Sequence, residues 1–298
     1  MAVVPQIAKQ LSLTTGIRFS DQYSPLPEYL PISIKTIAWV FPQLREVEFN
    51  GMYLDHIDSF ISAFRNLEII SCRQTVKSVF FEMSFAMFSC LSRLRELYLQ
   101  FDQPTEHSGY RYMMNKKGLW LPTSLESLTI INIFDPEEND ITGRDWLDVR
   151  TDHDFDKLIA RWNAMEETLL FKYQSFSQLN NLQRLTIGRC NSWTAKVWLD
   201  CFLPCFETLK HLHLISWEGD GYRESPSSWR RRHTAETDMI DTSDDVETAM
   251  KECISHMKSL LSLRLDSFNV PDDLVDVIHG LPNIQSVNIT KHDVPYTL

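Results

Sequence analysis

Two cysteines and two histidines form the most metal-like group of side chains in the sequence, because thiolates and imidazoles are the ligands that zinc prefers. Cys201 and Cys205 stand on one face of a segment with helical apolar spacing, whereas His211 and His213 alternate along a segment with strand spacing. We expect the hydrophobic core to lie between the thiols and the imidazoles. The sequence therefore predicts buried thiols and surface histidines at these positions, with no metal site and no cofactor.

Motifs of known catalytic chemistry are missing from the chain. The sequence has no His-Glu-x-x-His zinc motif, no glycine-rich phosphate loop and no motif that supports a Ser-His-Asp or Cys-His set. It contains only 9 glycines in all, which argues against a loop that cradles a nucleotide. We therefore predict a protein without enzymatic activity and keep an enzyme with an unrecognised site as the remote alternative.

The charge of the chain bears on the partners that it can bind. Its 29 basic and 40 acidic side chains give a net charge of −11, which repels a nucleic-acid backbone over much of the surface. The one compact basic run, Arg230, Arg231 and Arg232, precedes a run of acidic residues that offsets its field. We interpret the basic run as a solvated loop and expect no nucleic-acid partner.

The hydrophobic segments are short, and none approaches the roughly 20 apolar residues that a membrane-spanning helix needs. The first residues also lack the apolar core of a signal peptide. We therefore expect no membrane partner and a cytoplasmic or nuclear protein that is not secreted. In such a compartment the cysteines should be reduced, and their apolar surroundings predict that they are buried. These cysteines are Cys72, Cys90, Cys190, Cys201, Cys205 and Cys253.

The elements that would position these side chains follow one repeated pattern. An apolar residue is followed by two residues of any type, a second apolar residue, one residue of any type and a third apolar residue. This apolar triplet is the strand signature of a leucine-rich repeat. One such repeat cannot bury its apolar face alone, so the recurrence predicts a stack of repeats with a shared core. Six clear and two looser triplets begin at residues 44, 67, 94, 125, 182, 209, 260 and 284.

The predicted fold is an α/β leucine-rich-repeat solenoid of about eight irregular repeats. Between the strands, apolar residues keep helical spacing, as in residues 54–64, 246–257 and 274–281. Each repeat would then consist of a strand, a turn and a helix, with parallel strands on the concave face and helices on the convex face. We assign residues 41–298 to this domain and interpret residues 1–40, which several prolines interrupt, as an irregular N-terminal cap.

Two of the steps between triplets are about twice the usual period and contain insertions. The first insertion, at about 134–152, is rich in acidic residues. The second, at about 217–245, combines glycine, proline, serine, the basic run and an acidic run. Insertions in a repeat protein form loops, often on the binding face. We expect two loops, which are either tolerated excursions from the repeat or parts of a binding surface.

The residues between the apolar positions of each triplet should face the concave surface, because side chains alternate along a strand. This predicted surface mixes neutral polar groups with a few charges, which suits a protein contact better than a phosphate groove. The predicted partner-binding residues are Glu96, Tyr98, Gln100, Thr129, Arg184, Thr186, His211, His213, Arg264, Asp266 and Asn288, with Ser127, Ser262 and Ser286 beside them.

The phrase Leu-Gln-Arg-Leu-Thr-Ile-Gly-Arg-Cys-Asn, from Leu182 to Asn191, resembles the cysteine-bearing leucine-rich repeats of F-box proteins. With the uneven repeat lengths and aromatic-rich helices, residues from about 41 to 290 are similar to a fungal F-box-type repeat protein, without a recognisable F-box. The resemblance implies a protein-interaction module, either a substrate receptor of an SCF-type ubiquitin ligase or a diverged relative. A Skp1-type adaptor would be a partner if an F-box lies outside this sequence. The alternative is a free-standing scaffold or inhibitor unrelated to ubiquitination.

Overall fold

In the computed structural model the chain forms two compact units, Met1–Asp135 and Pro136–Leu298, and separate stretches of each unit are described. In each unit the described residues form an α/β structure with parallel strands. The described stretches are 13–20, 37–50, 61–74, 85–101, 120–131, 173–188, 194–215, 243–266 and 272–290, together with parts of 156–170.

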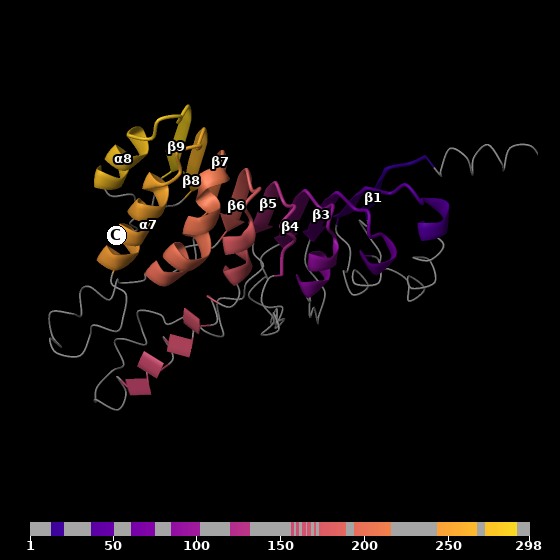
Figure 1. The fold of residues 1–298 in the computed structure, drawn as a ribbon, viewed down its shortest axis with the longest axis horizontal. Coiled ribbons are helices and arrows are strands. Elements are labelled where there is room, and N and C mark those ends of the chain that lie inside the picture. Colours follow the sequence, from indigo (N-terminus) through magenta and orange to yellow (C-terminus); the bar gives the residue numbers. More distant parts are fainter. Residues whose placement is uncertain are drawn as a thin grey trace, which may run out of the picture. The chain divides into compact units, whose positions relative to one another are not determined.

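The strands of the first unit pair in the order in which they occur in the chain (Figure 1). Every described pairing is parallel, and Val47, Ile70, Leu97 and Leu128 lie in register on successive strands. A short 3-10 helix, η1 (Phe85–Cys90), precedes the fourth strand. The strands are β1 (Gly16–Ser20), β2 (Glu46–Asn50), β3 (Ile69–Gln74), β4 (Glu96–Phe101) and β5 (Ser127–Ile131).

The second unit repeats this arrangement with β6 (Arg184–Gly188), β7 (His211–Ile215), β8 (Ser262–Asp266) and β9 (Ser286–Thr290). All three described pairings are again parallel and sequential. Helical segments lie along one side of these strands (Figure 1) and contact one another. They are η2 (Gln174–Gln178), the π-helical η4 (Val197–Phe202), the 3-10 helix η5 (Leu203–Thr208), α7 (Ser243–Ser255) and α8 (Asp272–His279).

The predicted apolar triplets form the core. In the seven triplets that begin between residues 44 and 260, every apolar side chain is at most 7% exposed, so the strand prediction is confirmed there. The triplet of Ile284, Val287 and Ile289 also forms a strand, but its side chains are only half-buried. That difference follows from its position, since β9 pairs with a described strand on one side only, through β8.

Main-chain hydrogen bonds fix where each strand starts. In the seven triplets that begin between residues 44 and 260, the first residue donates its N–H to the carbonyl oxygen three residues earlier, as from Leu94 to Leu91 at 3.0 Å. The next two N–H groups share one carbonyl acceptor at the start of the preceding strand: Arg95 and Glu96 both donate to the Glu68 carbonyl oxygen, at 2.8 and 3.0 Å. The same shared carbonyl occurs ahead of seven of the described strands, and it sets the register of each strand against the one before.

The structure differs from the sequence-based expectations at β1 and at the second insertion. The sequence does not predict β1, which lies within residues 1–40, because Thr14 takes the place that an apolar residue holds in the other repeats. Helix α7 begins at Ser243, inside the predicted second insertion, so that insertion ends earlier than expected. The first insertion and the three consecutive arginines lie outside the described residues. Within the described part of the chain, no helix is long and apolar enough to span a membrane.

Candidate functional site

Each unit has an open face, which we define as the side of its strands opposite the apolar triplets. All eleven predicted partner-binding residues lie there, and each is exposed or half-buried. Four belong to the first unit and seven to the second. The open face of the second unit consists of Arg184, Thr186, Gly188, His211, His213, Ile215, Ser262, Arg264, Asp266, Ser286, Asn288 and Thr290.

The strand register brings residues from three strands of the second unit together. His213 on β7 is level with Arg264 on β8, and Asp266, two residues further along β8, is level with Thr290 on β9. Side chains on the same face of neighbouring parallel strands are close enough to interact. The parallel register therefore creates a polar cluster from residues that are far apart in the sequence.

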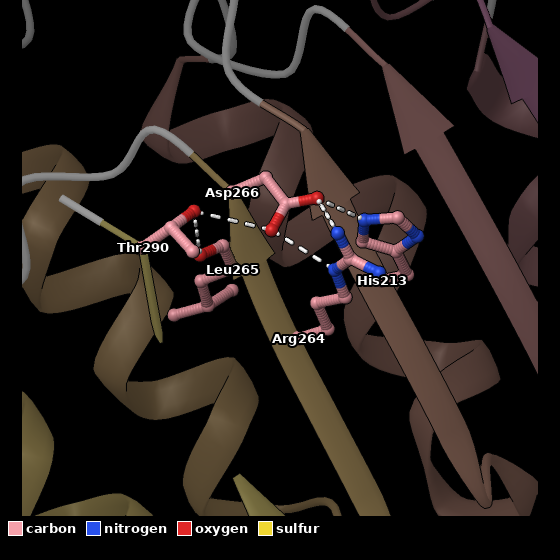
Figure 2. A network of polar contacts seen from close by, with 5 residues as sticks. All are labelled: His213, Arg264, Leu265, Asp266 and Thr290. Atoms are coloured by element: carbon pink, nitrogen blue, oxygen red, sulfur yellow. Dashed lines mark hydrogen bonds and ion pairs between the residues drawn. The ribbon is translucent and has the colours of Figure 1, made fainter. Parts of the chain in front are cut away.

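The carboxylate of Asp266 lies at the centre of this cluster, as Figure 2 shows. Its Oδ2 is 2.7 Å from Nε2 of His213 and 2.9 Å from a terminal nitrogen of Arg264. Its Oδ1 accepts hydrogen bonds from Nε of Arg264 at 2.9 Å and from the hydroxyl of Thr290 at 3.2 Å. A carboxylate offers about four lone-pair sites, so the acceptor capacity of Asp266 is used within the protein.

These contacts change the acidity of the carboxyl group. Partial burial acts to raise the pKa of Asp266, but hydrogen bonds from Arg264 and His213 and the charges of both side chains outweigh burial and hold this pKa below its ordinary value. The same hydrogen bond, together with the negative charge of Asp266, raises the pKa of the Arg264 guanidinium. Asp266 is therefore ionised at neutral pH and holds the guanidinium and the imidazole in fixed positions on the open face.

The open face of the first unit is organised around an aromatic ring. The guanidinium of Arg73 lies 4.6 Å from the centroid of the Tyr98 ring, a cation–π contact. The Tyr98 hydroxyl donates to Oε1 of Gln100, so Arg73 contacts the face of the tyrosine ring and Gln100 holds its hydroxyl. Further along the face, Arg18 and Glu48 form an ion pair at 2.7 Å. Tyr98 and Gln100 were predicted for this surface, whereas Arg73, Arg18 and Glu48 were not.

Charged side chains also line up at the residue just ahead of several strands. Arg45 pairs with Glu68 at 3.1 Å, and Arg95 lies 3.9 Å from Glu126. In the second unit Nζ of Lys210 donates to Oε1 of Gln183 at 3.2 Å. In the first unit, basic and acidic residues alternate at this position in successive repeats, and this alternation, visible in the sequence, could have revealed the Arg45–Glu68 and Arg95–Glu126 pairs.

The cysteine and histidine residues of the possible zinc set lie in different surroundings. Cys201 and Cys205 are buried in the core, and Cys253 joins them there. Burial raises the pKa of all three thiols, to about 11 for Cys201 and about 12 for Cys253, and the charges of Asp200 and Glu252 add smaller increases to the pKa of Cys201 and of Cys253 respectively. His211 and His213 point to the open face. The described stretches contain no group of three or more His, Cys, Asp or Glu side chains that could hold a metal ion.

The prediction that every cysteine is buried is wrong for one residue. Cys72 is buried in β3, as expected, and Cys190 lies outside the described residues. Cys90 is exposed because it ends η1, whose buried side is formed by Phe88. An apolar sequence neighbourhood therefore did not decide which side of this short helix faces the solvent.

Sequence reasoning also missed Thr290, which completes the cluster around Asp266. Its hydroxyl bonds to the Asp266 carboxylate and lies 3.5 Å from the Leu265 carbonyl oxygen. The signal that could have identified it is its place in the repeat, since Thr290 holds in β9 the position that Asp266 holds in β8.

Two comparisons with known proteins add no relative. No model of a known protein family matches the chain, and a search of curated proteins finds no match.

Proposed function

We propose that this protein is a leucine-rich-repeat solenoid without enzymatic activity that binds a protein partner through its open faces. The observation that supports this proposal most directly is the cluster of His213, Arg264, Asp266 and Thr290, in which four polar side chains from three strands are held in place on a solvent-facing surface. Polar groups that are fixed before binding lose less conformational entropy when a partner docks.

The composition of the open faces supports a protein as the ligand. Tyrosine and arginine are enriched where proteins contact each other, and they are frequent among the residues that dominate binding energy. Tyr98 with Arg73 in the first unit and Arg264 in the second are such residues, each held by a neighbouring side chain. Strands that present alternate side chains give a broad surface rather than a closed pocket for a small molecule.

Site-specific photo-crosslinking in cells of the source organism tests the proposal. A photoreactive residue at Ser286 or Asn288, both exposed on the open face of β9, should become linked to a distinct protein. The matched controls carry the same residue at Glu252 on α7 and Asp276 on α8, which are exposed on helices of the same unit. Equal labelling from open-face and helix positions, or no product from the open face, would contradict the proposal.

The resemblance to F-box-type repeat proteins supports one class of partner first, a substrate that the protein delivers to a ubiquitin ligase. Co-purification of the full natural protein with the Skp1-type adaptor is the appropriate measurement. Adaptor binding would support a substrate receptor. Its absence, together with crosslinks from the open face, would instead support a free-standing scaffold or inhibitor.

A further inference from the structure

The open face of the second unit differs in charge from the chain as a whole. The chain carries a net charge of −11, whereas this face carries two arginines, Arg184 and Arg264, two histidines and one carboxylate, that of Asp266. Arg184 and His211 are exposed, and within the described part of the chain no hydrogen bond or ion pair occupies their side chains. The face therefore presents positive charge on a protein that is otherwise strongly acidic.

The single carboxylate does not compete for these cations. Both oxygens of Asp266 are occupied by Arg264, His213 and Thr290, which leaves it little capacity to accept a further hydrogen bond. Arg264 uses two of its nitrogens on Asp266, and its side chain remains 53% exposed. Its remaining N–H donors are available to a ligand in the planar geometry that suits a carboxylate.

We propose that the open face of the second unit binds an acidic segment of the partner protein, whose Asp or Glu side chains pair with Arg184 and Arg264. This inference rests on the proposed function, because it specifies the chemistry of the partner at the same surface. Charge complementarity favours it over a basic or an apolar segment. The hydroxyls and amide of Thr186, Ser262, Ser286 and Asn288 supply neutral hydrogen-bonding groups around the two arginines.

The register sets the spacing of the acidic side chains. Arg184 is level with His211 and Ser262, and Arg264 stands two residues beyond Ser262, two strands away from Arg184. Strands are about 4.8 Å apart and rise about 3.3 Å per residue, so the two arginine Cα atoms are about 12 Å apart. Four residues of an extended peptide span about 13 Å. The segment should therefore carry acidic residues four positions apart.

Fluorescence anisotropy with a defined probe tests this inference on the full chain. The probe is a short labelled peptide of Ala and Ser that carries Glu at every fourth position, and the control peptide has Gln in place of each Glu. At low ionic strength the Glu peptide should bind and the Gln peptide should not, and added salt should weaken binding. The double variant Arg184→Gln/Arg264→Gln should lose about tenfold or more in affinity, since hydrogen bonds to charged groups contribute most strongly.

A control variant with the same change of net charge separates local recognition from a general charge effect. Arg93→Gln/Lys258→Gln alters two exposed residues in the turns that precede β4 and β8, away from the open face. It should bind the Glu peptide as the unmodified protein does. Arg184→Gln alone, at a side chain with no bonded neighbour among the described residues, tests the inference if the change at Arg264 impairs folding.

Several outcomes overturn the inference. The first is that the Glu peptide does not bind, and the second is that the two double variants lose affinity equally. The third is self-association of the protein that Arg184→Gln/Arg264→Gln abolishes, because this would identify a second copy of the chain as the occupant. Crosslinks from Asn288 to a partner segment that lacks acidic residues would also overturn it while leaving the proposed function intact. Binding of the Glu peptide without any crosslinked protein would instead contradict the proposed function.

Discussion

The thiol of Cys253 on α7 lies 3.3 Å from the carbonyl oxygen of Trp198, 55 residues earlier in η4, and donates a hydrogen bond to it. The same carbonyl accepts the N–H of Leu203, a bond of the π-helical turn. The contact links two helical segments beneath neighbouring strands of the second unit. Cys253 is fully buried there, in a core that also contains the Trp198 and Phe202 rings.

Replacing this thiol should destabilise the second unit. Cys253→Ala removes buried volume and the hydrogen bond to Trp198, so we expect the free energy of unfolding to fall by about 1–2 kcal/mol. Urea denaturation followed by tryptophan fluorescence measures the change. Cys90→Ala, the same substitution at an exposed thiol, should leave stability within about 0.5 kcal/mol. Equal effects of the two substitutions would show that burial of Cys253 contributes little.

The stability that Asp266 provides should depend on pH. Because its folded-state pKa is lowered, its contribution is present above the unfolded-state value near 3.9 and is lost as the pH falls through the folded-state pKa. Asp266→Asn should therefore lower the free energy of unfolding by about 1 kcal/mol at pH 7. The difference between the two proteins should shrink toward zero in acid. Denaturant titrations at a series of pH values measure it, and a constant difference would exclude ionisation as the cause.

The two histidines of β7 should respond differently to substitution. His213→Ala removes a hydrogen-bond partner from Asp266, so we expect the free energy of unfolding to fall by about 1 kcal/mol. His211→Ala changes an exposed side chain and should cost less than about 0.5 kcal/mol. Thermal unfolding of the two variants side by side checks this order. If His211→Ala were the more destabilising change, the contact of His213 with Asp266 would not be the larger contribution of these two side chains to stability.

The thiols should also differ in reactivity. A thiol reagent at neutral pH should modify Cys90 quickly, whereas Cys201, Cys205 and Cys253 should react only on unfolding, because they are buried and their pKa values are raised. Mass spectrometry of peptides after timed labelling distinguishes these sites. Rapid modification of Cys253 in the folded protein would contradict the burial of α7 against η4.

The sequence predicts most of the strands because their apolar spacing is local information. Leu94, Leu97 and Leu99 lie within a span of six residues, and their spacing alone predicts both strand β4 and the burial of the three side chains. The pairing of His213 with Asp266 could not be predicted in this way, although both residues were placed on the correct face. It bridges 53 residues, and it depends on the register of β7 against β8 and on the side-chain rotamers of both residues.

The same limits explain what the sequence missed. Strand β1 lacks the first apolar residue of the triplet, since Thr14 stands there, so only its pairing with β2 identifies it. Cys90 ends a short 3-10 helix whose orientation depends on packing rather than on composition. Local patterns therefore predicted the strands, while contacts between repeats had to be observed.

The carbonyl groups that each accept two successive N–H donors have a consequence for how this protein can change over evolutionary time. Register between strands is held by main-chain atoms, as where Lys210 and His211 both bond to the Gln183 carbonyl. Any residue other than proline supplies the same N–H and carbonyl groups. Exposed open-face positions such as Arg184 and Asn288 can therefore mutate without shifting a strand, so a new binding preference can arise by single substitutions on an unchanged frame.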